Sequence, residues 1–351
     1  MYFGHWVLGF VWNLDIMVKK YLSRQAFLKR IKDTIDQYSM LREGDKVLVA
    51  VSGGADSVCL LISMLALAKK LGIRIAAANI DHCLRGKESE KDSAFVRELC
   101  GRLGVEFHSA KVNVRSGGKK GASVEEKARQ ARYDFLRKAA LKAGCSAIAT
   151  GHTLDDQAET VLLKIIHGGS MAGLSGIPPV RAEGKILVIR PLIRAERKDI
   201  LAYLRNEGVG HVEDSTNSDV RFLRNRVRLE VIPYLERLNP KIKRSMANLA
   251  DGLREDMELV ESLKRRAAPE AGRVMKISGM LAQPVSARKQ AFKTLFERAG
   301  GNVKKLTYRH WMDFDLFIRR AGKGRSLDLP GGVSAVRREN EIVFESKSSM
   351  N

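Results

Sequence analysis

The segment SGGADS, residues 52–57, places small and polar residues between two apolar runs. It follows VLVAV (47–51), which has the β-branched composition of a buried strand, and precedes an apolar helical pattern. Two adjacent glycines allow successive backbone N–H groups to face one point at the positive end of the following helix. We therefore predict a phosphate or pyrophosphate loop made of Ser52, Gly53, Gly54, Ala55, Asp56 and Ser57.

Two other classes of turn compete with this interpretation. The spacing is not that of a Walker A loop, because no Gly-Lys-Ser/Thr follows and no lysine is available for a terminal phosphate. The structural alternative is a tight strand-to-helix turn in which Ser or Asp caps the helix. An uninterrupted run of six such residues directly after a buried strand favours the phosphate loop.

A second polar segment, GHTLDDQAET (151–160), follows another predicted strand. Thr153 or Asp155 is expected to cap the next helix, and Asp156 and Glu159, spaced i and i+3, lie on one helical face. Carboxylates there are predicted either to bind Mg²⁺ or to hold a cationic amine and accept its proton. His152 at the strand end is a candidate phosphate contact. The structural alternative for the acids is stabilisation of the helix dipole.

Arginines recur at helical spacing in two later segments. Arg129 and Arg132 are spaced i and i+3 in EEKARQARYDFL (125–136), and Arg224 and Arg228 share a stripe in RFLRNRVR (221–228). A guanidinium can bind phosphate oxygens through two hydrogen bonds, so Arg224 is the preferred phosphate contact. The alternative for both segments is a solvated basic face.

The elements that must position these residues alternate between strand and helix from Lys46 to about Arg190. The strands are almost entirely apolar, which is typical of a parallel sheet covered on both faces. The predicted fold class is therefore a doubly wound α/β domain. Ligands of such sheets bind outside the carboxyl ends of the strands, where SGGADS and GHTLDDQAET both fall.

The chain changes character near residue 240. We predict an uncertain apolar extension over 1–16, with Met17 as an alternative start, a nucleotide-binding domain over 17–240 and a smaller, mainly helical basic domain over 241–351. Residues 271–325 hold thirteen Lys/Arg against three acids. The aromatic side chains among them are mostly expected in the core: Phe292, Phe296, Tyr308, Trp311, Phe314 and Phe317.

Composition limits the class of partner and the compartment. The net charge of +22 predicts a polyanionic partner, nucleic acid before membrane. The four cysteines form no CxxC pair, which indicates reduced thiols in a cytoplasmic protein and not a zinc ribbon or a disulfide framework. The apolar start lacks a basic region and a cleavage site and is too short to span a bilayer, so no membrane association is expected.

The chain also resembles a known family. SGGADS resembles the loop of the PP-loop, or N-type, ATP pyrophosphatases, whose fold is adenine nucleotide α-hydrolase-like. Further blocks resemble tRNA(Ile)-lysidine synthetases from about Lys46 to Pro240: IDHCLRGKESEKDSAFV, EEKARQARYDFL, ATGHTLDDQAETVLL and DSTNSDVRFLRNRVRLEVIPYL followed by LNP.

This resemblance implies an activity. ATP would adenylate the wobble cytidine of an isoleucine tRNA with a CAU anticodon, and the ε-amine of free lysine would displace AMP to give lysidine. Asp56, with Asp156, would assist Mg²⁺, and His82 and Arg85 would contact ATP. The implied catalytic set is Asp56, His152, Asp156, Glu159 and Arg224. The implied tRNA or phosphate contacts are Arg129, Arg132, Arg224 and Arg228.

Several alternatives stay open. A 2-thiocytidine enzyme shares the SGG-x-DS loop but needs paired cysteines, which this chain lacks. A non-catalytic RNA-binding protein would not require Asp56, Asp156 and Glu159 together. Lysine as the nucleophile depends on the resemblance alone, and the oligomeric state is left open, with a homodimer as one alternative.

Overall fold

The computed structural model describes residues 22–81, 87–111, 124–212, 221–267 and 273–346. The chain forms two compact units, Met1–Leu253 and Arg254–Asn351. The dividing point lies within helix α10 (Ile242–Ala267). The domain boundary predicted at residue 240 stays a prediction. His82, Arg85 and residues 1–16 lie outside the described residues.

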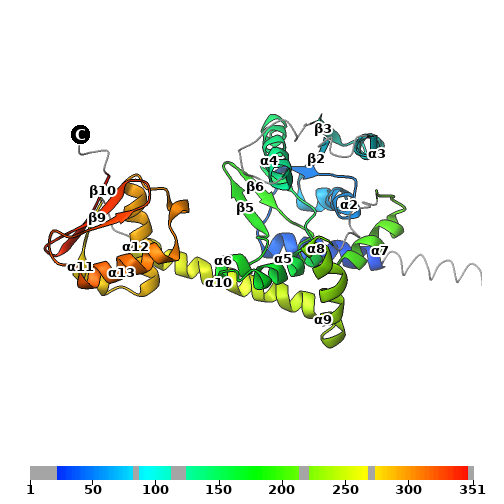
Figure 1. Cartoon of the computed structure of the whole chain (residues 1–351). Helices are drawn as coiled ribbons and strands as arrows, with labels where there is room; N and C mark the ends of the chain where they lie inside the picture. Colours follow the sequence, from blue (N-terminus) through cyan, green and yellow to red (C-terminus); the bar gives the residue numbers. More distant parts are fainter. Residues whose placement is uncertain (1–21, 82–86, 112–123, 213–220, 268–272, 347–351) are drawn as a thin grey trace, which may run out of the picture. The chain divides into compact units, whose positions relative to one another are not determined.

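The first unit contains a six-stranded sheet in the order β3-β2-β1-β4-β6-β5 (Figure 1). All neighbouring pairs are parallel except β5 with β6, which are antiparallel. The strand bounds are Lys46–Ala50 (β1), Arg74–Asp81 (β2), Glu106–Lys111 (β3), Ala147–Ala149 (β4), Val180–Glu183 (β5) and Ile186–Ile189 (β6). The chain order reverses between β1 and β4. Both predicted polar segments follow these two strands, at the switch point where doubly wound sheets bind ligands.

Side chains of one strand alternate between two cores, which is why the strands are apolar throughout. Val47 and Val49 of β1 pack on one face with α2 and α7, whereas Leu48 packs on the other with α4. The helix over residues 22–37 adds Phe27 and Ile31 to the first core. The helices are α2 (Ala55–Leu71), α3 (Lys87–Arg102), α4 (Val124–Lys142) and α7 (Arg197–Glu207). The doubly wound α/β prediction is confirmed.

A helical layer beside the carboxyl end of β4 has its own small core. Ala158 and Val161 of α5 pack against Val227, Ile232 and other apolar residues of the helices that follow. These helices are α5 (Leu154–Ile166), α6 (Met171–Leu174), α8 (Leu223–Arg226), α9 (Ile232–Leu238) and α10, with a π-helical turn, η3, at Val227–Val231. The helical spacing noted in RFLRNRVR is therefore present from Leu223 onward, but it passes into a π turn at Val227.

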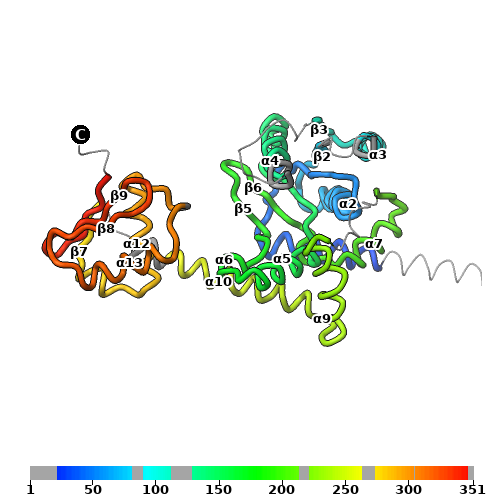
Figure 2. Tube along the Cα trace, in the orientation of Figure 1, coloured from blue at the N-terminus to red at the C-terminus, as the bar shows by residue number. Residues whose placement is uncertain are grey.

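The second unit, whose trace ends in red in Figure 2, combines helices with a four-stranded antiparallel sheet in the order β7-β10-β9-β8. Its core is aromatic: Phe292 stacks on Phe314 with ring centroids 4.5 Å apart. Its elements are β7 (Val274–Lys276), α11 (Ile277–Leu281), α12 (Val285–Arg298), η4 (Val303–Lys305), α13 (Tyr308–Arg320), β8 (Ser326–Leu329), β9 (Val333–Arg338) and β10 (Glu341–Ser346). The sequence analysis predicted a mainly helical region, and the structure adds a four-stranded sheet to its helices.

Four of the six aromatic residues singled out in this unit are buried: Phe292, Phe296, Trp311 and Phe314. Phe317 packs against the same core, whereas Tyr308 is 67% exposed. Within the described parts of the chain, no helix has the length and apolar character that a membrane crossing requires.

Candidate active site

The SGGADS loop joins β1 to the N-terminus of α2. Gly53 has φ +96°, a conformation that side-chain-bearing residues rarely adopt, and a Cβ there would lie 3.4 Å from Val212. Gly54 precedes the first turn of α2, and no side chain caps the helix. An uncapped helix N-terminus that follows a glycine turn is a suitable site for an anion.

Internal hydrogen bonds give the loop its shape. The Ser57 hydroxyl accepts the backbone N–H of Ser52 at 3.1 Å and donates to the Gly54 carbonyl at 2.9 Å. Ser57 is buried and braces the loop, whereas Ser52 is exposed. Buried Asn79 on β2 donates to the Val51 carbonyl at 2.8 Å, which fixes the end of β1.

The chain after β4 approaches the loop closely at Gly151. A Cβ on Gly151 would lie 3.1 Å from the Asp56 carbonyl carbon and from the Ser57 nitrogen, which is tighter than ordinary contact. Only glycine allows these two backbone segments to meet without displacement. The two polar segments predicted from the sequence therefore form one site.

Asp56 has one oxygen paired and one free. Its Oδ2 accepts a hydrogen bond from Nη1 of Arg197 at 2.7 Å, whereas its buried Oδ1 has no partner among the described residues. Burial raises the pKa of Asp56 to about 6, since desolvation of the carboxylate outweighs the attraction of Arg197. A buried carboxylate oxygen without a donor fits a cation ligand.

The first turn of α5 carries the predicted acids. Thr153 caps the helix in a capping box with Asp156: the Thr153 N–H donates to Oδ2 of Asp156 at 2.9 Å. The other oxygen of Asp156 accepts Nη2 of Arg224 at 3.0 Å. The cap prediction is confirmed for Thr153. Both oxygens of Asp156 already have protein partners, so Asp56 Oδ1 is the better cation ligand of the pair.

Glu159 lies one turn further and is fully buried. It accepts Nε of Arg224 at 2.7 Å and Nε of Arg228 at 2.5 Å. A buried carboxylate is stable only when it is paired, and here two guanidinium groups pair with it. Arg228 lies in the π turn, which is a frequent feature of functional sites. Arg226 instead pairs with Glu230 on the exposed side.

His152 belongs to the second polar segment and lies between β4 and the start of α5. Its Nδ1 lies 3.0 Å from the Thr150 hydroxyl. Burial, together with the nearby Arg190 guanidinium, lowers the pKa of His152 to about 4. The imidazole is therefore neutral at pH 7, where it can donate or accept one hydrogen bond but carries no charge.

The arginines predicted on α4 lie near other cations. Arg129 and Arg132 are exposed, and the Arg129 guanidinium lies 5.8 Å from the ring centroid of Tyr133. Arg181 on β5 approaches the same ring, at 5.0 Å. Buried Arg190 donates Nη1 to the Pro178 carbonyl at 2.5 Å. This basic group lies at the carboxyl end of β6, next to His152.

Four charged residues at the site were not predicted by the sequence analysis as functional: Asp155, considered only as a helix cap, and Arg197, Glu236 and Lys243. The Lys243 ammonium lies 2.8 Å from Oδ1 of Asp155 and 2.9 Å from Oε1 of Glu236. These side chains join Asp56 and the α5 acids around a cavity of about 140 Å³. It is lined by Asp56, Thr153, Asp155, Asp156, Glu159, Arg197, Arg228, Ile232, Pro233, Glu236 and Lys243. No local motif marks Arg197 or Lys243, because Asp56 and Asp155, with which they pair, are remote in the sequence.

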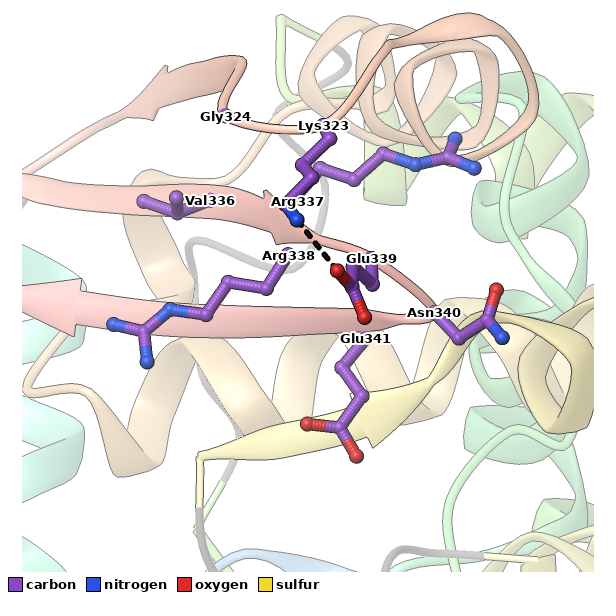
Figure 3. Close-up of a pocket in the computed structure, with 8 residues that line it drawn as sticks. All are labelled: Lys323, Gly324, Val336, Arg337, Arg338, Glu339, Asn340 and Glu341. Carbon is purple, nitrogen blue, oxygen red and sulfur yellow. Dashed lines mark hydrogen bonds and ion pairs between the residues drawn. The ribbon is translucent and has the colours of Figure 1, made fainter.

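A larger open groove of about 600 Å³ lies in the second unit (Figure 3). Lys323 and Glu339 point toward each other and form an ion pair at 2.5 Å. The lining is Lys323, Gly324, Val336, Arg337, Arg338, Glu339, Asn340 and Glu341. Its lining has neither a buried acid nor a phosphate loop, whereas the smaller cavity of the first unit has both Glu159 and Asp56 of the SGGADS loop.

Comparison with known proteins agrees with this geometry. A PP-loop domain family matches residues 24–235. A tRNA(Ile)-lysidine synthase of Geobacter sulfurreducens is 33% identical over 327 residues, which are 91% of this chain and 69% of that protein. One of Thermus thermophilus is 38% identical over 86% of this chain and 56% of its own length.

The chain belongs to the tRNA(Ile)-lysidine synthase family. It is thus a PP-loop enzyme that uses ATP, and the family does not favour the 2-thiocytidine alternative. A third relative, from Symbiobacterium thermophilum, is 40% identical over 70% of this chain and 51% of its own length. The chain thus spans from about half to 69% of the length of these three curated relatives.

A solved structure shows the same fold. The U34-tRNA thiolase NcsA of Methanococcus maripaludis, with its [4Fe-4S] cluster, has a TM-score of 0.56 and 18% identity. The match covers 66% of this chain and 80% of the thiolase. At this identity the likeness concerns the fold alone. Among the described residues of the present chain, no group of three His, Cys, Asp or Glu side chains is arranged to hold a metal.

Proposed function

We propose that this protein ligates free L-lysine to C2 of the wobble cytidine in the isoleucine tRNA with a CAU anticodon. The C2 oxygen attacks the α-phosphate of ATP and releases pyrophosphate. The lysine ε-amine then attacks C2, AMP leaves with the oxygen, and the nitrogen loses a proton. The observation that carries the proposal is the uncapped PP-loop beside a cluster of acids, in a chain of this family.

The PP-loop supplies the site for the departing pyrophosphate. Backbone N–H groups of the first turn of α2 and its helix dipole favour an anion there. Mg²⁺, held by the free Oδ1 of Asp56, phosphate oxygens and water, would neutralise charge that develops on the leaving group. Neutral His152 is suited to a hydrogen bond with a phosphate oxygen without contributing charge.

The acids of α5 are suited to the amine. Asp156 and Glu159 face the cavity beside Asp56 and would attract an ammonium group and accept its proton before attack. In the present state Arg224 pairs with both acids. Its side chain is 47% exposed, so it can exchange these partners for a phosphate when substrates bind.

Arg129 and Arg132 are proposed contacts for an RNA or ATP phosphate, and Arg224 and Arg228 are proposed to contribute further positive charge at the site. The second unit would bind the RNA backbone through its exposed cations, in a salt-dependent manner. We further propose that the enzyme acts in the cytoplasm, because the described cysteines Cys59, Cys100 and Cys145 are all unpaired thiols. The homodimer considered from the sequence stays a prediction.

The decisive experiment measures transfer of radiolabelled lysine to a transcript of the CAU-anticodon isoleucine tRNA in the presence of ATP and Mg²⁺. We expect ATP-dependent incorporation by the wild type and its loss in Asp56→Asn. The matched control is Asp33→Asn, since Asp33 is an exposed acid on the helix over residues 22–37. AMP and pyrophosphate release without lysine on the tRNA would retain adenylation and exclude lysine as the nucleophile. Retained tRNA binding without AMP release would favour the non-catalytic alternative.

A further inference from the structure

The segment from Arg194 to Arg197 is held against the first turns of α10. The Arg194 guanidinium donates to Oδ1 of Asn248 at 2.8 Å and also pairs with Asp251. Glu196 accepts Nη2 of Arg244 at 2.7 Å. Three consecutive turns of α10 thus contact the segment that leads to Arg197, at the start of α7. These contacts fix the segment 194–197 relative to α10.

Lys243 links the same helix to the first turn of α5. Its ammonium lies 2.8 Å from Asp155 Oδ1 and 2.9 Å from Glu236 Oε1. The side chains of Lys243 and Asp155 are only 18% and 19% exposed, so water screens this pair weakly. Loss of one partner would leave the other charge partly buried, which is costly.

The second oxygen of Asp155 connects the Lys243 ion pair to the PP-loop through Arg197. Oδ2 of Asp155 accepts the backbone N–H of Arg197 at 2.8 Å, at the start of α7. The Arg197 side chain then donates Nη1 to Oδ2 of Asp56 at 2.7 Å. The contacts form a continuous path from Lys243 through Asp155 and Arg197 to Asp56. The path ends at the carboxylate whose other oxygen is free in the cavity.

We propose that Lys243 is a positioning residue that acts through Asp155 and Arg197 to hold the free oxygen of Asp56 toward the bound Mg²⁺–pyrophosphate group. The inference rests on the proposed function of the PP-loop. Lys243 touches neither the reacting atoms nor the nucleotide in this scheme. It orients a ligand, as the outer partners of metal-binding carboxylates do.

A simpler role for Lys243 is charge balance in an acidic cavity. The two roles differ in which partner matters. If Lys243 only neutralises charge, Asp155 and Glu236 are equivalent, because each lies within 2.9 Å of the ammonium. If Lys243 positions Asp56, Asp155 matters more than Glu236, because Asp155 accepts the hydrogen bond from the Arg197 N–H.

The test measures calorimetric binding of Mg²⁺ with inorganic pyrophosphate to the full chain. We expect Lys243→Met to weaken Mg²⁺-dependent binding by about 10- to 100-fold, the usual cost of removing an outer partner of a metal ligand. Lys243→Arg should restore most of it. The control Lys241→Met, at an exposed lysine two residues earlier, should match the wild type.

A second set of variants keeps the test valid if Lys243→Met folds poorly. Asp155→Asn should weaken binding as much as Lys243→Met does, and the double variant should be no weaker than either, because both changes break one path. Glu236→Gln should weaken Mg²⁺–pyrophosphate binding clearly less than Asp155→Asn does. Equal effects of Asp155→Asn and Glu236→Gln, additive losses in the double variant, or wild-type binding by folded Lys243→Met would overturn the positioning role.

The outcome separates this inference from the proposed function. Lysine incorporation that depends on Asp56 but is unaffected by Lys243→Met would retain the function and overturn the path. If Lys243→Met and Asp155→Asn weaken Mg²⁺–pyrophosphate binding but the protein transfers no lysine, the positioning role is retained and lysine is excluded as the nucleophile.

Discussion

The two units of this protein use charge in different ways. In the first unit the acids of the site are buried or half-buried and hold defined partners, as fully buried Glu159 does with Arg224 and Arg228. In the second unit most cations are at the surface, over an aromatic core. Buried charges require fixed partners because desolvation is costly, whereas surface cations can exchange one partner for another at little cost. The first arrangement suits chemistry at defined atoms, and the second suits binding to a polyanion.

The largest effect is expected from Glu159→Gln. The change leaves two guanidinium groups without their buried carboxylate, so we expect the free energy of unfolding to fall by about 3–5 kcal/mol. Lysine transfer should also be lost. Chemical denaturation measures the first effect. The comparison variant is Glu230→Gln, whose exposed pair with Arg226 at 3.5 Å should contribute less than about 1 kcal/mol. Similar losses for both variants would contradict the distinction between buried and surface charge.

Gly151→Ala is expected to have the next largest effect. Its Cβ would press on the PP-loop backbone at 3.1 Å, and displacement of a reacting group by about 1 Å can lower the rate roughly 100-fold. We expect a reduced kcat for AMP release with a cooperative thermal transition retained. Gly101→Ala is the control, since no atom lies within 4 Å of its added Cβ. A wild-type rate for Gly151→Ala would show that the loop tolerates displacement.

The pH dependence of Mg²⁺–pyrophosphate binding should follow Asp56. Its pKa is raised from 3.8 to about 6 in the folded protein. Below about pH 6 the proton occupies the carboxylate, so binding should weaken by about tenfold per pH unit. For stability the sign is opposite: the favourable contribution of the protonated group is complete below pH 3.8 and is lost as pH rises through 6.

Asp56→Asn separates these two effects. The variant should bind Mg²⁺–pyrophosphate weakly at all pH values. It should unfold at a higher temperature, relative to the wild type, at pH 7.5 than at pH 4.5, since only the ionised carboxylate carries the cost of burial. A pH-independent binding constant for the wild type between pH 5 and 7 would exclude Asp56 as the titrating ligand.

The smallest effects are expected in the second unit. Lys289 and Arg309 lie on α12 and α13, and the Lys289 ammonium is 4.8 Å from the ring centroid of exposed Tyr308. Replacing both cations with Gln should weaken tRNA binding several-fold and lower the salt slope by about one per cation. The kcat should be unchanged. Filter binding over a range of salt tests this, with Lys29→Gln on the first unit as the control. A loss of kcat at saturating tRNA would contradict the assignment of these cations to docking.

The sequence by itself determined the parallel strands, the PP-loop and the acids of α5, because each depends on residues close together in the chain. VLVAV followed by SGGADS specifies a buried strand and an anion-binding turn, and Thr153 with Asp156 specifies a helix cap. The topology that unites the two polar segments also follows, since parallel strands present their carboxyl ends at one edge. The predicted roles of individual site residues await the experiments above.

Tertiary structure alone decided which charges meet. Asp56 and Arg197 are 141 residues apart, and Arg228 and Glu159 are 69 apart, and no local spacing encodes such pairs. The π turn that contains Arg228 and the antiparallel strand β5 were likewise decided by packing. The same holds for Asp56 itself: its residue type is legible in SGGADS, but its raised pKa and single free oxygen arise from burial and from Arg197. Desolvation and pairing are properties of the assembled site. The sequence therefore identifies Asp56 as a candidate acid, and the fold determines its pKa and its free oxygen.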